Sequence, residues 1–191
     1  AHWGTSIYQC PYCHGWEIQD GRFGVLVPNV EMLEYALLLR GWTSSLVVLT
    51  NGAALDIPAE MRARLDRARV TVEPRRIKRL VGSSSAPMTS KLAAVELEDG
   101  ASIPLETIFA RPPQKQVSIV ESLTLRGLAL DPQGFVQVSD HRETSIPGIF
   151  AGGDLITPMQ SAIIAAAAGM QAAAFLNHEL TVELATSGEL A

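Results

Sequence analysis

The stretch GVLVPNVEMLEYALLLRGWTSSLVVLT, residues 24–50, contains an apolar run, a helical pattern and a second apolar run. Residues 24–27 and 46–50 are continuous apolar segments bounded by turn residues, which is typical of buried strands. Between them, apolar side chains recur at helical spacing, after Asn29, which can cap a helix, and before Gly41, which can end one. The stretch therefore predicts a strand–helix–strand unit.

The same alternation continues toward the C-terminus. A charged helix is predicted at 58–68, where a proline fits the first turn, and residues 70–73 predict a third strand. Strands that alternate with helices indicate an α/β fold of the Rossmann type, with three layers and a parallel sheet. Residues 77–81 and 92–98 predict an antiparallel β-ribbon packed on this unit, with a loop at 83–87.

The last part of the sequence follows a different pattern. Residues 111–116, RPPQKQ, are rich in proline and predict a linker. Beyond it we expect a helix at 118–126, a strand at 135–138, a strand ending at Ala151 and a long alanine-rich helix after Pro158.

The composition indicates a soluble globular protein. The 191 residues carry a formal net charge of −5, and an acidic chain without a basic stripe is not expected to bind nucleic acid or an anionic membrane. The densest basic patch, 75–79, is interpreted as a solvated strand edge. The most apolar run, 162–170, is too short to span a membrane, and two cysteines are too few for a secreted disulfide scaffold. No signal-peptide pattern is seen, so we expect a cytoplasmic protein.

Both cysteines lie in the stretch CPYCH, residues 10–14. The spacing is compatible with a redox-active disulfide, with half of a metal site or, given the following histidine, with a haem attachment point. The other histidines are single and scattered, which disfavours zinc, and haem attachment generally implies export. Two unpaired buried thiols are a further alternative. A redox pair is the favoured interpretation.

The redox interpretation has a physical basis. A two-residue spacer lets the sulfurs of Cys10 and Cys13 meet across one turn at the start of a helix, where the positive end of the macrodipole stabilises a thiolate. Pro11 sets the backbone of that turn. His14 can supply or accept the proton that thiol–disulfide exchange requires. The candidate catalytic residues are Cys10, Cys13 and His14.

A second motif, TSIPGIFAGGDLITPMQSAIIAAAAGMQAAA at residues 144–174, indicates which class of redox protein this is. It resembles the closing flavin-binding segment of the thioredoxin-reductase-like pyridine nucleotide–disulfide oxidoreductases, in which Thr-x-x-Pro-Gly-x-[Phe/Tyr]-Ala-x-Gly-Asp precedes a helix of small residues. The agreeing positions are Thr144, Pro147, Gly148, Phe150, Ala151, Gly153 and Asp154. This family also places a Cys-x-x-Cys before its central nucleotide-binding domain, as the present sequence does.

The resemblance implies an FAD cofactor. It implies that small residues let the backbone approach the flavin, that Asp154 hydrogen-bonds a ribityl hydroxyl, and that the following helix directs its N-terminal amides at the flavin. The expected cofactor-binding residues are Gly153, Asp154, Gln160, Ser161 and Ala162. By the same resemblance Cys13 faces the flavin, Cys10 exchanges with the substrate, and the protein is a homodimer. The histidine after the second cysteine, acidic in classical thioredoxin reductases, resembles the flavin-dependent dithiol oxidases of the same superfamily.

The nicotinamide-nucleotide site lacks its glycines. A dinucleotide fold needs Gly-x-Gly-x-x-Gly/Ala after the first strand, whereas this sequence reads VPNVEM. Val27, Asn29 and Met32 place side chains where glycines would leave room. After the next strand, Thr50 and Asn51 offer neither the acid that reads a ribose hydroxyl nor an arginine for a 2′-phosphate. We therefore expect weak or absent NAD(P)H binding.

Members of the family begin with another glycine-rich strand–turn–helix, which holds the adenine end of FAD. No stretch before Cys10 matches it, so the chain resembles the C-terminal part of a family member. The expected domains are a redox-motif segment at 1–17, a nucleotide-binding domain with a degenerate glycine motif at 18–112, and the C-terminal portion of an FAD-binding domain at 113–191.

The expected function is flavin-dependent thiol–disulfide oxidoreduction. Cys10 and Cys13 would exchange electrons between FAD and a substrate dithiol or disulfide, carried by a small molecule or a thioredoxin-like protein. If NAD(P)H is excluded, electrons run from a dithiol through the cysteines and flavin to oxygen. The alternative is a decayed nucleotide-binding module without catalytic activity, which serves dimerisation or partner binding.

Overall fold

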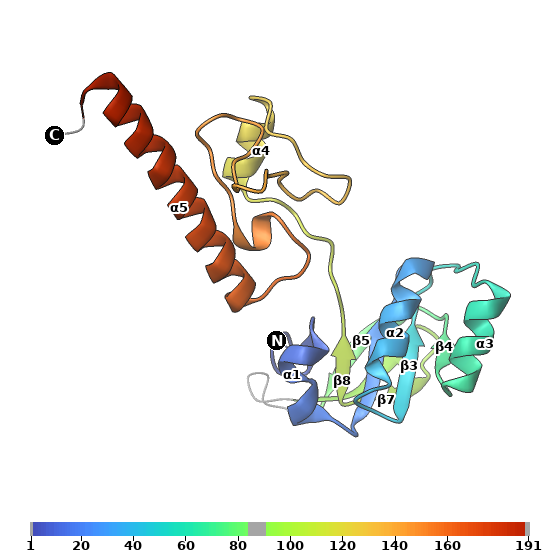
Figure 1. Ribbon diagram of the computed structural model, residues 1–191. Helices are drawn as coiled ribbons and strands as arrows, with labels where there is room; N and C mark the ends of the chain where they lie inside the picture. Colours follow the sequence, from blue (N-terminus) through green and yellow to red (C-terminus); the bar gives the residue numbers. More distant parts are fainter. Residues whose placement is uncertain (1, 84–90, 190–191) are drawn as a thin grey trace. The chain divides into compact units, whose positions relative to one another are not determined.

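The computed structural model describes residues 2–83 and 91–189, and the chain forms two compact units, Ala1–Pro112 and Pro113–Ala191 (Figure 1). The loop expected at 83–87 lies, apart from its first residue, outside the described residues. The first unit is an α/β structure with a parallel sheet and a small antiparallel sheet, so the predicted fold class is confirmed.

A five-stranded parallel sheet, with the strand order β1-β8-β2-β3-β4, is the centre of the first unit. Its strands are β1 (Ile7–Tyr8), β2 (Arg22–Leu26), β3 (Ser45–Leu49), β4 (Thr71–Glu73) and β8 (Thr107–Phe109). The helices are α1 (Pro11–Ile18), the 3₁₀-helix η1 (Val30–Met32), α2 (Leu33–Leu39) and α3 (Ala59–Arg67). The predicted order of three strands and two intervening helices is confirmed from β2 to β4.

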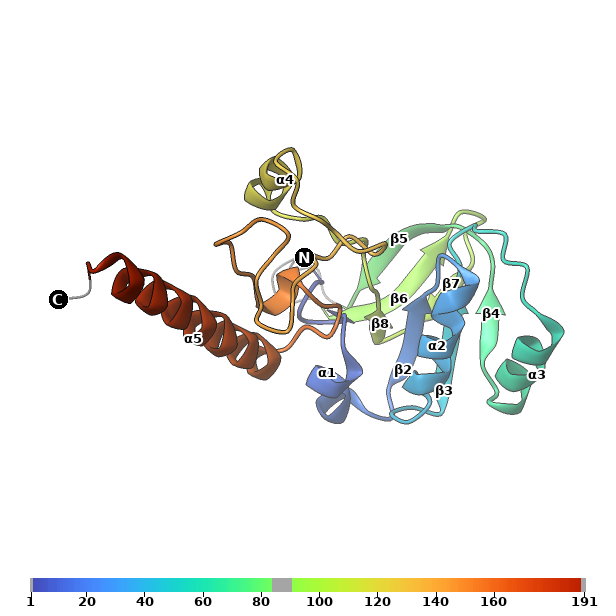
Figure 2. The same cartoon turned by 45° about the horizontal axis from the view of Figure 1, so that its top comes forward.

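Side chains on the two faces of this sheet belong to two separate cores. Phe23, Val25 and Val48 pack with buried residues of α2 and α3. On the opposite face, Leu49 and Ile108 pack with the antiparallel ribbon, whose strands are β5 (Ile77–Gly82), β6 (Leu92–Leu97) and β7 (Ser102–Pro104). Helices, sheet and ribbon therefore form three layers (Figures 1 and 2).

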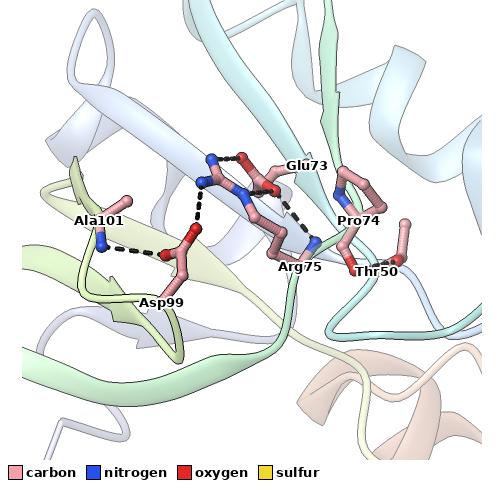
Figure 3. A network of polar contacts seen from close by, with 6 residues as sticks. All are labelled: Thr50, Glu73, Pro74, Arg75, Asp99 and Ala101. Atoms are coloured by element: carbon pink, nitrogen blue, oxygen red, sulfur yellow. Dashed lines mark hydrogen bonds and ion pairs between the residues drawn. The ribbon is translucent and has the colours of Figure 1, made fainter.

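Ion pairs join the ribbon to the sheet at the end of β4. Arg75 pairs with Glu73 at 2.6 Å and with Asp99, in the turn between β6 and β7, at 2.8 Å (Figure 3). Two further basic residues of the predicted patch pair with Glu96 of β6. The basic side chains are about half exposed, but acidic neighbours already compensate their charges.

The second unit contains α4 (Ser118–Thr124), the 3₁₀-helix η2 (Gly153–Leu155) and α5 (Ala162–Ser187). Both helices expected from the sequence are confirmed. The side chain of Ser161 caps the start of α5 by accepting a hydrogen bond from the amide of Ile164. Gly188, with a left-handed φ of 78°, ends the helix.

The two strands expected in the second unit, at 135–138 and ending at Ala151, form only isolated bridges, so this prediction was wrong. Val136 bridges Leu130, and Phe150 bridges Glu143. The backbone amide of Val136 donates to Leu155, whereas the next amide donates to Ala129. Because successive backbone groups bond to different segments, no ladder of paired residues forms with one neighbour.

Candidate functional site

Helix α1 carries both cysteines in its first turn. Cys10 is the N-cap residue, with an extended backbone, and Pro11 is the first helical residue, where its missing amide costs no hydrogen bond. The amide of Cys13 donates to the carbonyl of Cys10 at 3.3 Å. Both thiols are free, and Cys13 is exposed while Cys10 is partly buried. The turn therefore brings the two sulfurs together at the positive end of the helix.

The Cys13 thiol is less acidic than an ordinary thiol. A hydrogen bond with the Cys10 side chain, followed by desolvation and the charge of Cys10, raises the pKa of the Cys13 thiol above its ordinary value. Cys13 therefore keeps its proton at a pH where an ordinary thiol begins to ionise. The hydrogen bond shows that the side chains of the two cysteines interact in this turn.

His14 is exposed, and its ring stacks on the buried ring of Tyr8 at 4.5 Å between centroids. The hydroxyl of Tyr8 donates to the carbonyl of Thr5 at 2.8 Å, which holds the ring in place. His14 follows Cys13 directly in the first turn of α1, and its ring is held by this stacking contact. No pattern in the sequence predicts the stacking on Tyr8.

The segment that holds the pyrophosphate in a dinucleotide fold is occupied here by the protein's own side chains. Val27 is fully buried, and its amide donates to Leu49. The Asn29 side chain accepts a hydrogen bond from the amide of Met32 at 3.2 Å, so it uses a donor at the helix start where a pyrophosphate would bind. The carboxylate of Glu34 in α2 is hydrogen-bonded to the guanidinium of Arg64 in α3.

The loop after β3 is also engaged within the unit. Asn51 has a left-handed φ of 51°, and its side chain accepts a hydrogen bond of 2.8 Å from the amide of Ile77 in β5. Thr50 is buried and donates to the carbonyl of Ala53. The Oδ1 of Asn51 and the hydroxyl proton of Thr50 are therefore already used within the unit. The residues of this strand edge therefore do not fit a tightly bound NAD(P)H.

The predicted flavin-binding residues lie together in the second unit. Gly153 and Asp154 are in η2, and residues 160–162 form the start of α5. Asp154 and Gln160 line a cavity of about 230 Å³, and the Gln160 amide donates to the side chain of Gln114 at 2.7 Å. Asp154 is exposed and forms no hydrogen bond or ion pair with any described residue. An uncommitted carboxylate beside a cavity fits the hydroxyl donors of a ribityl chain.

The glycines of this motif have a packing role of their own. A Cβ on Gly152 would lie 3.1 Å from the backbone of Ala168 in α5. Gly153 has a left-handed φ of 70° and faces Ala165. The alanine-rich helix can therefore approach the glycine turn closely. The contact of Gly153 with a flavin stays a prediction.

The described residues contain neither a metal-binding cluster nor a membrane-spanning helix. No group of three or more His, Cys, Asp or Glu side chains in 2–83 and 91–189 could hold a metal ion. Within the same ranges, no helix is both long and apolar enough to cross a membrane.

Comparison with known proteins agrees with the fold. The profile of the family described as pyridine nucleotide-disulphide oxidoreductase matches residues 34–173. The chain is 31% identical to thioredoxin reductase tcpT of Claviceps purpurea, over 80% of this chain and 47% of the relative. It thus spans about half the length of the curated relatives it matches.

Solved structures give the same result. The crystal structure of HlmI superposes with a TM-score of 0.80 at 32% identity, covering 97% of this chain and 56% of that chain. An oxidoreductase from Agrobacterium tumefaciens gives a TM-score of 0.79 at 31% identity, covering 95% and 58%. The family implies a flavin cofactor, FAD. The chain belongs to the pyridine nucleotide-disulphide oxidoreductase family and is similar to its thioredoxin reductases.

Proposed function

We propose that this protein is a flavin-dependent thiol–disulfide oxidoreductase in which Cys10 and Cys13 form the redox pair. The observation that carries the proposal is the contact of the two thiols in the first turn of α1, which raises the pKa of Cys13. A thiol pair of this kind has a direct use in disulfide exchange, whereas a purely structural module has no need of it.

The direction we propose is oxidation of a substrate dithiol. A substrate thiolate attacks the sulfur of Cys10 in the Cys10–Cys13 disulfide and forms a mixed disulfide with Cys10. The thiolate of Cys13 is released and takes up a proton. The second substrate thiol then attacks the substrate sulfur of the mixed disulfide and releases Cys10. The products are the substrate disulfide and two protein thiols, so two electrons and two protons have moved to the protein.

His14 is the proposed proton carrier. As the residue after Cys13, it would take the proton of the attacking substrate thiol and supply the proton that a released thiolate takes up. When bound, FAD supplies the two-electron acceptor that regenerates the disulfide, with oxygen as the terminal oxidant. Asp154 and the residues at the start of α5 would hold its ribityl and ring portions.

Two features support a dithiol rather than NAD(P)H as the electron donor. Asn29 uses an amide where a pyrophosphate would bind, and Asn51 is bonded to the ribbon where a ribose would be read. The relatives named thioredoxin reductases favour a thioredoxin-like protein as one class of substrate, and a small dithiol is the other. A homodimer stays a prediction.

The test is oxygen uptake by the protein encoded by the complete gene, with dithiothreitol as the substrate. We expect uptake by the wild type and none by Cys10→Ser or Cys13→Ser, because neither variant can form the disulfide that the substrate thiolate attacks. Reduction of a disulfide substrate by NADPH, without dithiol oxidation, would indicate the classical direction. A protein without flavin or thiol chemistry would favour the non-catalytic module.

A further inference from the structure

Tyr35 connects helix α2 to the residue that precedes the redox pair. Its hydroxyl donates a hydrogen bond of 2.8 Å to the carbonyl oxygen of Gln9, the neighbour of Cys10 in the chain. The guanidinium carbon of Arg111 lies 5.2 Å from the centroid of the Tyr35 ring. The ring is therefore held by a cation, while its hydroxyl holds the peptide group that leads into Cys10.

This peptide group matters because of where Cys10 stands. As the N-cap residue, Cys10 has an extended backbone, with φ −130° and ψ 119°, and its side chain makes no capping hydrogen bond. The direction of its sulfur follows from the backbone on either side. Pro11 fixes the backbone on the helix side, and the carbonyl of Gln9, held by Tyr35, fixes it on the other.

The phenol hydroxyl of Tyr35 remains a hydrogen-bond donor over the physiological pH range. Burial raises the pKa of Tyr35 far above its ordinary value, an effect that Arg111 opposes and that negative charge on Cys10 and Cys13 reinforces. The hydroxyl therefore stays protonated in both redox states of the pair. The influence of both cysteines also means that the phenol lies within electrostatic reach of the two sulfurs.

We propose that Tyr35 is a positioning residue for the Cys10–Cys13 pair, which holds the Gln9–Cys10 peptide so that the sulfur of Cys10 stays within bonding reach of Cys13. This inference rests on the proposed function. Holding two reacting groups together raises their effective concentration and so favours the disulfide over two separate thiols. Helix α2, which in a dinucleotide fold opens the phosphate site, would here support the redox helix.

The experiment measures the equilibrium of the pair with glutathione in the protein encoded by the complete gene. Protein dithiol and glutathione disulfide give protein disulfide and two glutathione thiols, and mass spectrometry after acid quenching gives the fraction oxidised. Tyr35→Phe keeps the ring under Arg111 and removes only the hydroxyl. Because the Gln9–Cys10 peptide is then less restrained in the dithiol, the effective concentration of the two thiols should drop, and we expect the equilibrium constant for disulfide formation to fall about fivefold.

Thr50→Val is the matched control. It removes a side-chain hydrogen bond of 2.8 Å, to the carbonyl of Ala53, in the same unit. We expect it to lower the melting temperature as much as Tyr35→Phe does and to leave the glutathione equilibrium unchanged.

An unchanged equilibrium in Tyr35→Phe, or an equal fall in Thr50→Val, would overturn the positioning role while leaving the proposed function intact. If the wild-type protein forms no Cys10–Cys13 disulfide at any glutathione ratio, the proposed function fails and this inference fails with it.

Discussion

Gly15 lies directly against the indole of Trp42. A Cβ built on Gly15 would stand 2.5 Å from both Cδ1 and Nε1 of that ring. The ring of Tyr12 packs edge-on against the same indole at 5.2 Å, and the carbonyl of Trp42 accepts a hydrogen bond from the amide of Asp20. Two residues of α1 and one just after it therefore contact Trp42, which lies in the turn between α2 and β3. These contacts hold α1, and with it both cysteines, in position within the first unit.

Gly15→Ala should therefore destabilise the first unit. The added methyl group overlaps an indole that Tyr12 already confines, so α1 must move, at a cost of about 1–3 kcal/mol. The measurement is urea denaturation followed by tryptophan fluorescence, because all three tryptophans lie in this unit.

Gly169→Ala is the control, measured by circular dichroism. No atom lies within 4 Å of a Cβ at this position in α5, so the higher helix propensity of alanine should leave stability equal or raise it by up to about 1 kcal/mol. A Gly15→Ala protein as stable as the wild type would mean that Trp42 does not set the position of α1.

Cys13 should react slowly with iodoacetamide until the pH exceeds the ordinary pKa of a thiol. The neighbouring Cys10 side chain raises the pKa of Cys13, and a raised pKa means less thiolate at a given pH. In Cys10→Ala the midpoint for Cys13 alkylation should move to lower pH, because the hydrogen bond and the charge are gone. The rates are measured under anaerobic, reducing conditions by peptide mass spectrometry. Identical midpoints in the two proteins would show that the thiols do not interact.

Glu73→Gln should reduce the acid sensitivity of the first unit. Hydrogen bonds from the Arg75 side chain lower the pKa of Glu73 below its ordinary value of 4.5 (Figure 3). A carboxyl whose folded pKa is lowered contributes stability above its unfolded pKa, and this contribution is lost as the pH falls through the folded pKa. Stability should therefore fall less in the variant than in the wild type between about pH 5 and pH 3.

At neutral pH the Glu73→Gln variant should lose about 1 kcal/mol or less, since Arg75 is half exposed. Glu179→Gln, which changes an exposed side chain of α5 without a partner among the described residues, should keep the wild-type pH profile. Parallel profiles for Glu73→Gln and the wild type would contradict the role of this ion pair.

Asp154→Ala should weaken flavin binding. If the carboxylate accepts hydrogen bonds from ribityl hydroxyls, its loss should raise the dissociation constant for FAD about tenfold to a hundredfold. Flavin fluorescence during titration of the apoprotein measures the constant. Asp140→Ala removes another exposed carboxylate of the same unit, and its FAD affinity should match the wild type. If all three proteins bind FAD with equal affinity, Asp154 does not contact the ribityl chain.

The elements predicted well are those with a local signal. Helix α2 follows from apolar residues at helical spacing, although the asparagine expected to cap it caps the preceding 3₁₀-helix η1, and α5 follows from a run of alanines. Strand β1 was missed because two residues carry no periodicity and because Ile7 pairs with Ile108, which is distant in the sequence. The opposite error at 135–138 has the same cause, since an apolar segment becomes a strand only beside a partner.

The candidate site shows the same limit. The motif around Cys10 and Cys13 is readable because both residues lie within one turn of helix. The hydroxyl of Tyr35 bonds to Gln9 across 26 positions, and an aromatic residue in an apolar helix looks like ordinary core. His14 of α1 stacks on Tyr8 of β1. No sequence pattern predicts how this helix lies against this strand.

The most direct test of the central claim is the visible spectrum of the protein encoded by the complete gene, recorded anaerobically after addition of NADPH and then of dithiothreitol. The account predicts that NADPH leaves the flavin band unchanged, that dithiothreitol bleaches it, that air restores it, and that Cys10→Ser abolishes the bleaching. Rapid bleaching by NADPH, at micromolar affinity, would contradict the account, because the closed loop after β2 would then bind a dinucleotide after all.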